Sequence, residues 1–181
     1  MLATHNTVLA FWFNEVDPKQ WWKADPAFEE LVRQRFGTML QQAAQGELYR
    51  WRNKAKGRLA EAIVLDQFSR NIHRNTPMAF SQDAMALALG QEAITAGSHQ
   101  SLTATECSFL MLPYMHSKSR LVHAEAERLS REYAPPYNYE FELKHKAIVD
   151  RFGRYPHRNG ILGRTSTAEE VEFLQQPESG F

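Results

Sequence analysis

Apolar residues recur at steps of three and four along most of the chain, which is the period of an amphipathic α-helix. The pattern is plainest after Asp25-Pro26, a pair that suits the N-cap and first position of a helix. Gly46 is expected to end that helix. Its apolar face consists of Phe28, Leu31, Val32, Phe36, Met39, Leu40 and Ala43. No stretch of any length shows the strict alternation of a half-buried strand.

A second helix is predicted from about Arg58 to His73, and apolar residues surround it on almost every side. Such a helix is expected to be the most buried one in the fold. It nevertheless carries Asp66, Arg70 and Arg74, which are spaced four apart and share one face. Because a buried charge needs a partner, we expect Asp66 to pair with Arg70.

Capping and proline signals mark the helices that follow. Thr76-Pro77 is expected to begin a helix that closes at Gly97. Thr103 and Glu106 then have the spacing of a capping box, in which each side chain bonds the backbone of the other. Pro113 is expected to kink or end this third helix within its last turn, since proline lacks the backbone N–H.

The C-terminal part of the chain continues in the same way. Ser117 is predicted to cap the next helix, and Pro135-Pro136 is the clearest break in the chain. Helices are then predicted from about 138 to 152 and from 169 to 176. Together with a short helix near the N-terminus, these elements predict a single all-α domain, residues 1–181, of about eight antiparallel helices with short links.

Composition narrows the class of protein. The chain has 21 basic and 21 acidic residues, so general attraction to nucleic acid or to an anionic membrane is not expected. The apolar run 8–13 is too short for a signal peptide or a membrane span. Cys107, the one cysteine, excludes an internal disulfide and suits a reducing compartment. We therefore expect a cytoplasmic protein without a cofactor.

Candidate chemistry concentrates in a loop near the C-terminus, residues 151–167. Its glycines and its proline exclude a helix through the middle, and its polar residues include Arg151, Arg154, His157, Arg158, Asn159 and Arg164. Thr167 and Glu170 form a second capping box, so the loop leads into a helix N-terminus, where free backbone N–H groups favour an anion. Arginine is the residue that binds carboxylate or phosphate through two parallel hydrogen bonds.

The predicted helices follow one another as pairs, although no repeat sequence recurs at a fixed spacing. Such pairs favour an α-solenoid-like stack over a simple bundle. Four stretches, moreover, are similar to a mostly bacterial family, the domain of unknown function 924. They are 8–13 (VLAFWF), 65–71 (LDQFSRN), 113–117 (PYMHS) and 151–167 without Gly160. This resemblance spans nearly the whole chain and implies a tetratricopeptide-repeat-like (TPR-like) helical fold. It implies no established activity.

The chain departs from the family pattern at two positions. Where the family usually has glutamate after His-Ser, this chain has Lys118, and where it often has proline after Leu-Asp-Gln-Phe, this chain has Ser69. If that glutamate is a catalytic acid in the relatives, the chain lacks it.

The first hypothesis is a pocket for a small ligand that carries phosphate or carboxylate, with enzymatic activity left open. Asp66, His116 and His157 are the candidate catalytic residues, because imidazole titrates near neutrality and a carboxylate can orient it. We expect the Asp66–Arg74 face, His116 and the C-terminal loop to meet in one polar cluster. The candidate ligand-binding residues are Arg70, Asn71, Arg74, His145, Arg151, Arg154, Arg158, Asn159 and Arg164.

Other interpretations stay open. The same residues could form an internal network of hydrogen bonds and ion pairs that holds the C-terminal loop in place. A TPR-like module could instead bind a protein or peptide through exposed aromatic residues, for which Trp21, Trp22, Tyr137 and Tyr139 are candidates. A metal site is weaker, because no helix carries a metal-binding histidine pair. His5, His73, His99 and His123 are interpreted as ordinary surface or capping residues.

Overall fold

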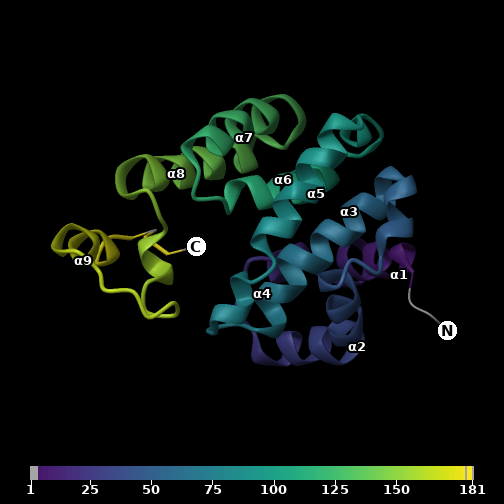
Figure 1. Cartoon of the computed structure of the whole chain (residues 1–181), viewed down its shortest axis with the longest axis horizontal. Coiled ribbons are helices and arrows are strands. Elements are labelled where there is room, and N and C mark those ends of the chain that lie inside the picture. Colours follow the sequence, from purple (N-terminus) through teal and green to yellow (C-terminus); the bar gives the residue numbers. More distant parts are fainter. Residues whose placement is uncertain (1–3, 178, 181) are drawn as a thin grey trace.

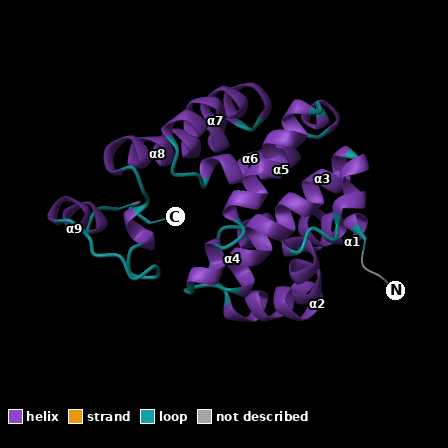
Figure 2. Cartoon of the chain, viewed as in Figure 1, coloured by secondary structure: helices purple, strands orange, loops and turns teal. Residues whose placement is uncertain are grey.

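Helices form all the regular structure in residues 4–177 and 179–180, the part of the chain that the computed structural model describes (Figure 1, Figure 2). The all-α prediction is thereby confirmed, whereas the TPR-like stacking stays a prediction. The α-helices are α1 (His5–Ala10), α2 (Pro26–Ala44), α3 (Ala55–Ile63), α4 (Ser69–Ile72), α5 (Asp83–Thr95), α6 (Ala104–Met115), α7 (Arg120–Tyr133), α8 (Pro136–Phe152) and α9 (Ala168–Leu174).

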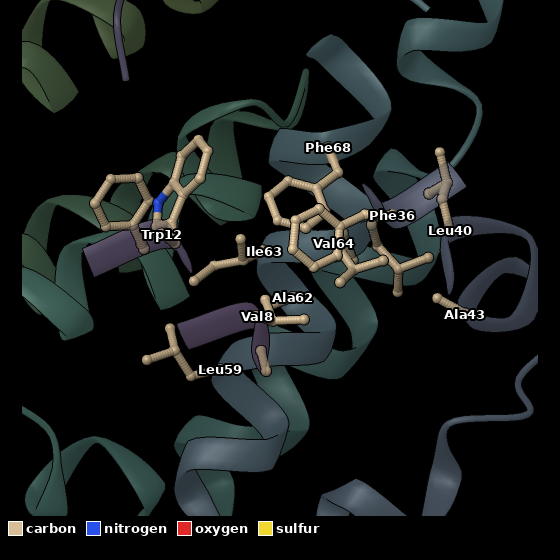
Figure 3. Close-up of a cluster of buried hydrophobic side chains, with 14 of the residues drawn as sticks. Val8, Trp12, Phe36, Leu40, Ala43, Leu59, Ala62, Ile63, Val64 and Phe68 are labelled. Carbon is tan, nitrogen blue, oxygen red and sulfur yellow. The ribbon is translucent and has the colours of Figure 1, made fainter. Parts of the chain in front are cut away.

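The centre of the fold is a continuous run of α3, a π-helical turn (Val64–Phe68) and α4. Helices α1, α2, α5 and α6 pack around this run, and its apolar side chains fill the core in Figure 3. The Phe68 ring lies 4.7 Å from Phe36 and 5.5 Å from Trp12, centroid to centroid. As the apolar pattern indicated, this is where the chain is most completely buried.

The central run differs from the predicted helix in two ways. It begins at Ala55, directly after the extended residue Lys54, and it contains the π turn. A π turn holds more residues per turn than an α-helix, so it changes the face on which the following side chains emerge. Asp66 and Gln67 lie inside this turn, and Arg70 comes two residues after its end. Turns of this kind are frequent at functional sites, and this one directs polar side chains out of an apolar helix.

The segment after α4 also differs from its prediction. Thr76-Pro77 begins a 3₁₀ turn (Pro77–Phe80), and α5 begins only at Asp83. The Ser81 hydroxyl donates to the carbonyl of Met78 at 2.8 Å and helps to close this turn. The break matters for the site, because it brings Phe80 and Asp83 beside Arg70.

Helices α6, α7 and α8 form the second half of the molecule, and α7 packs against both of the others. Helix α6 passes through Pro113 and ends at Met115, in agreement with the predicted end. The N-cap of α7 is Ser119, two residues after the predicted Ser117, and its hydroxyl accepts the N–H of Val122 at 3.4 Å. Because short links reverse the chain on either side of α7, α6 and α8 run in the same direction.

Two glycines of the helices give a matched test of packing. A Cβ at Gly57 would lie 2.0 Å from the carbonyl oxygen of Trp51, whereas a Cβ at Gly37 would meet nothing within 4 Å. We expect Gly57→Ala to lower the free energy of unfolding by about 2 kcal/mol through overpacking. Gly37→Ala, within α2, is expected to raise it by up to about 1 kcal/mol. Urea unfolding measures both, and equal effects would contradict the close approach of α3 to Trp51.

Candidate functional site

A cavity of about 710 Å³ lies where the central run meets α6, α8 and residues 157–161. Its size is that of a pocket for a small molecule. Figure 1 shows α4 opposite the part of the chain that follows α8. The basic side chains that line the cavity are Arg70, Arg74, His116, His145, His157 and Arg158.

Two arginines form the buried floor of the cavity. Arg70 Nη1 lies 2.8 Å from Asp83 Oδ1, and Arg158 Nη1 lies 3.4 Å from Asp83 Oδ2. Both guanidinium groups also lie over the Phe80 ring, at 5.6 Å and 4.7 Å. Arg70 Nη2 and Arg158 Nε are buried and make no hydrogen bond with any described residue. The described protein therefore leaves two donors of the floor without a hydrogen-bond partner.

No Asp or Glu occurs among the described residues that line the cavity, so the charges of its lining are those of arginines, which Asp66, Asp83 and Glu29 pair from outside the lining. Burial and the neighbouring charge of Arg70 lower the pKa of Arg158 to about 10, so this guanidinium stays charged at neutral pH. A cation that is costly to bury is stabilised by any anion placed beside it. Arg74 adds a third guanidinium at the wall, where it pairs with Glu29.

Asp66 and His116 form a buried dyad beside the floor. His116 Nδ1 lies 2.7 Å from Asp66 Oδ1, and Gln67 Nε2 donates to Oδ2 at 2.7 Å. Burial raises the pKa of Asp66, but the charge of Arg70 and the hydrogen bonds from His116 and Gln67 outweigh it and hold the pKa well below its usual value. An ionised carboxylate only accepts hydrogen bonds, so Nδ1 carries the proton and Nε2 is the nitrogen left to the cavity.

The three histidines of the cavity are neutral at physiological pH. Burial, with the positive charge of Arg70, lowers the pKa of His116 despite the opposite effect of Asp66. Burial likewise lowers the pKa of His145 to about 3 and that of His157 to about 4. The positive charge of the site therefore comes from arginine, and His116 Nε2 has a free lone pair that can accept a proton.

A second buried network lies behind the dyad. His123 Nδ1 is 2.6 Å from Glu142 Oε1, and His123 Nε2 is 2.9 Å from the carbonyl of Ser117. The Tyr155 hydroxyl donates to the carbonyl of Met115 and lies 3.2 Å from His123 Nε2. These contacts tie α7, α8 and the chain after α8 to the end of α6. They thereby fix the backbone on both sides of His116.

The structure brings together most, but not all, of the predicted site residues. Asp66 lies behind His116, and the cavity is lined by His116 and His157 and by Arg70, Asn71, Arg74, His145 and Arg158. The remaining four, Arg151, Arg154, Asn159 and Arg164, are absent from the lining. The predicted polar cluster thus includes His157 and Arg158 from the C-terminal loop and excludes the rest of that loop.

The excluded residues hold the loop to α9. Arg154 bonds Glu170 through Nε at 2.6 Å and Nη2 at 2.7 Å, and Asn159 Nδ2 donates to the same carboxylate at 3.2 Å. Arg151 pairs with Glu169 at 2.7 Å. Arg164 Nη2 donates to the Tyr155 carbonyl at 3.0 Å. For these four residues the structure matches the internal network that the sequence left open.

The expected anion site at the start of α9 is already filled by the protein. The capping box of Thr167 and Glu170 forms as predicted, and Glu170 Oε2 accepts the backbone N–H of Thr167 at 2.8 Å. The hydrogen bonds from Arg154 first, and then those from Thr167 and Asn159, lower the pKa of Glu170 to about 2. A carboxylate of the chain itself therefore occupies the position that the sequence suggested for a ligand.

Several residues of the site were missed by the sequence analysis. Asp83 and Phe80 were assigned to a helix without any role, and no local signal connects them to Arg158, which lies 75 positions from Asp83. His123 was interpreted as a surface or capping residue, but it is fully buried against Glu142. Lys118, the departure from the family pattern, is exposed and lies outside the cavity lining.

Within the described residues, no three His, Cys, Asp or Glu side chains are grouped as ligands for a metal ion. In the same part of the chain, no helix combines the length and the apolar character that crossing a membrane requires.

Comparison with known proteins agrees with the fold. No curated protein matches the chain. A solved structure of a protein of unknown function from Agrobacterium tumefaciens is 33% identical, with a TM-score of 0.89, and the match covers 94% of this chain and 96% of the other. The family model described as "Bacterial protein of unknown function (DUF924)" matches residues 8–178. The chain therefore belongs to the DUF924 family of bacterial proteins, as its four characteristic stretches indicated.

Proposed function

We propose that this protein binds a small anionic ligand, with a phosphate or carboxylate group, in the cavity above Arg70 and Arg158. One observation carries the proposal: two buried guanidinium groups have unused donors beside a cavity without a lining carboxylate. Guanidinium groups suit such anions because their paired N–H donors match two oxygens at once. Two other arginines of the described chain, Arg58 and Arg164, also have a buried nitrogen without a hydrogen-bond partner, but they lie outside the cavity lining.

The His116–Asp66 dyad supports a catalytic role for the same site. Its neutral Nε2 at the cavity is the arrangement of a general base whose ring is oriented by a carboxylate. Asp66 holds the ring and stabilises the imidazolium that forms on protonation, while the arginine floor holds the anionic group of the substrate. In this proposal His116 accepts a proton from the bound ligand, and His157 lines the site beside Arg158.

The alternative, a module that binds a protein or peptide, has less support. Three of the aromatic residues considered as anchors for a partner, Trp21, Trp22 and Tyr137, line the same cavity. They do not form a separate exposed surface, so a small ligand accounts for them equally well. A peptide would have to present its own anionic group, such as a terminal carboxylate, to the arginine floor.

Isothermal titration with phosphate, sulfate and acetate tests the proposal. We expect the wild-type protein to bind at least one of these anions and Arg158→Gln to bind it at least about tenfold more weakly, as for a lost hydrogen bond between charged groups. Arg74→Gln is a second variant, because Arg74 is partly exposed and the change should disturb the fold less. Arg131→Gln is the control, since Arg131 is exposed on α7 and outside the cavity.

Thermal unfolding of the same variants separates binding from stability. If Arg158 is purely structural, Arg158→Gln lowers the melting temperature while every anion that binds keeps its affinity. That result would exclude the proposed site.

A further inference from the structure

The two ends of the cavity differ in depth and in chemistry. At the deep end, Arg158 and His145 are each only 5% exposed. At the mouth, the lining consists of large aromatic side chains that are much more exposed: Trp22 (53%), Tyr137 (44%) and Phe141 (41%). Exposed aromatic residues gathered at one place mark a contact site for apolar groups. Here they surround the entrance to a buried cationic floor.

Along one face of helix α8, the lining changes from exposed aromatic residues to a buried basic residue. Tyr137, Phe141 and His145 are spaced four apart and all line the cavity, so they follow one another along the helix. From the first to the last is about 12 Å at 1.5 Å per residue. The aromatic end and the basic end of the cavity are therefore separated by more than the width of a phosphate or carboxylate group.

Helix α6 shows the same order along the chain, with apolar residues first and then a histidine. Leu112 lines the cavity one turn before His116, and Phe109, a further turn back, stacks against Trp22 with ring centroids 5.7 Å apart. His116, which directly follows α6, and His145, one turn after Phe141 in α8, have ring centroids 6.5 Å apart. Because α6 and α8 run in the same direction, their apolar segments also lie at the same end of the cavity.

We infer that the ligand is an amphipathic anion, with a carboxylate or phosphate at one end and an aromatic or alkyl body of roughly phenyl to hexyl size at the other. This inference rests on the proposed function and specifies its substrate class. The anionic group enters first and meets Arg70 and Arg158. The body lies between α6 and α8, where it contacts Leu112, Phe141 and Trp22. An inorganic anion fills only the deep end, and a hydroxyl-rich body such as a sugar leaves the aromatic mouth without an apolar partner.

Two titration series test the inference, each with a constant anionic group. The first is acetate, butanoate, hexanoate and octanoate, and the second is phosphate, phenyl phosphate and glucose 6-phosphate. Each buried methylene is expected to tighten binding about fourfold, so hexanoate should bind at least about tenfold more tightly than acetate. Phenyl phosphate should likewise bind more tightly than both phosphate and glucose 6-phosphate. A gain in either series supports the inference, provided that glucose 6-phosphate does not bind more tightly than phenyl phosphate.

Trp22→Ala locates the effect at the mouth of the cavity. We expect it to weaken hexanoate and phenyl phosphate severalfold and to leave acetate and phosphate unchanged, because the small anions do not reach Trp22. Phe141→Ala serves as a second variant should Trp22→Ala prove unstable. Tyr49→Ala is the control, since Tyr49 is 56% exposed and lies outside the cavity lining.

The outcomes distinguish this inference from the proposed function. The inference is wrong if an apolar body does not increase the affinity of any anion that binds. It is also wrong if glucose 6-phosphate binds more tightly than phenyl phosphate. The proposed function then stands as long as Arg158→Gln weakens binding. If the longer alkanoates bind but Arg158→Gln has no effect, the site is merely apolar and both are wrong. Both are also wrong if no member of either series binds.

Discussion

Asp66→Asn is expected to lower the free energy of unfolding by about 3 kcal/mol at neutral pH. The Asp66 side chain is 1% exposed and accepts from His116, Arg70 and Gln67 at 2.7–3.0 Å. Asparagine keeps the shape but removes the charge, so Arg70 retains only Asp83 as a carboxylate partner. Breaking a buried ion pair from one side costs about 3–5 kcal/mol, because the remaining charge is left uncompensated.

The effect of this substitution should depend on pH. The pKa of Asp66 is lower in the folded protein than its usual value of 3.8, so its ionised form stabilises the fold. That stabilisation is fully present above the unfolded pKa and is lost as the pH falls through the folded pKa. The difference between wild type and Asp66→Asn should therefore be full at pH 7 and should shrink below pH 4, roughly the unfolded pKa.

Urea unfolding at pH 7, 5 and 3.5 measures this difference. Asp150→Asn is the matched control, because Asp150 is 42% exposed and pairs with Lys146 on the surface of α8. It should change the free energy of unfolding by less than about 0.5 kcal/mol at pH 7. Equal effects of the two substitutions at pH 7 would show that Asp66 carries no special charge interaction.

Glu142→Ala is expected to be about as costly, at about 3 kcal/mol, whereas Glu142→Gln should cost less than about 1 kcal/mol. His123 Nε2 faces the Ser117 carbonyl at 2.9 Å and must donate to it. One proton is then shared between His123 Nδ1 and Glu142 Oε1, which are 2.6 Å apart. Burial raises the pKa of Glu142, and the hydrogen bond with His123 opposes this only in part. The raised pKa favours the neutral acid, a donor that the glutamine amide imitates well.

Alanine removes both the donor and the volume, so it leaves a cavity and an unsatisfied imidazole nitrogen. Thermal and urea unfolding of the two variants measure the difference. Glu132→Ala is the control, because Glu132 is 52% exposed on α7. If Glu142→Gln is as destabilising as Glu142→Ala, the pair is ionic and the shared-proton assignment is wrong.

Local sequence signals predicted where several helices begin. The caps at Asp25, Thr103 and Thr167 all form as expected, and in each the side chain accepts backbone N–H groups two or three residues ahead. Such signals act within one turn of helix, so the sequence carries them completely. The π turn at Val64–Phe68 and the 3₁₀ turn at Pro77–Phe80 have no comparable local marker. They depend on how distant segments pack, and the sequence alone did not predict them.

The candidate site also combines features that the sequence predicted with features that only the fold decided. The sequence by itself determined that the fold is helical, and that Asp66 and Arg70 share one face of the most buried helix. Only the tertiary structure decided which basic residues of the C-terminal loop reach the cavity. Arg154 and Arg158 are four residues apart, yet Glu170 binds Arg154, while Arg158 packs between Phe80 and Tyr155. The physical reason is that the partner of each guanidinium comes from a different distance along the chain. Glu170 is 16 residues from Arg154, whereas Asp83 lies 75 residues from Arg158.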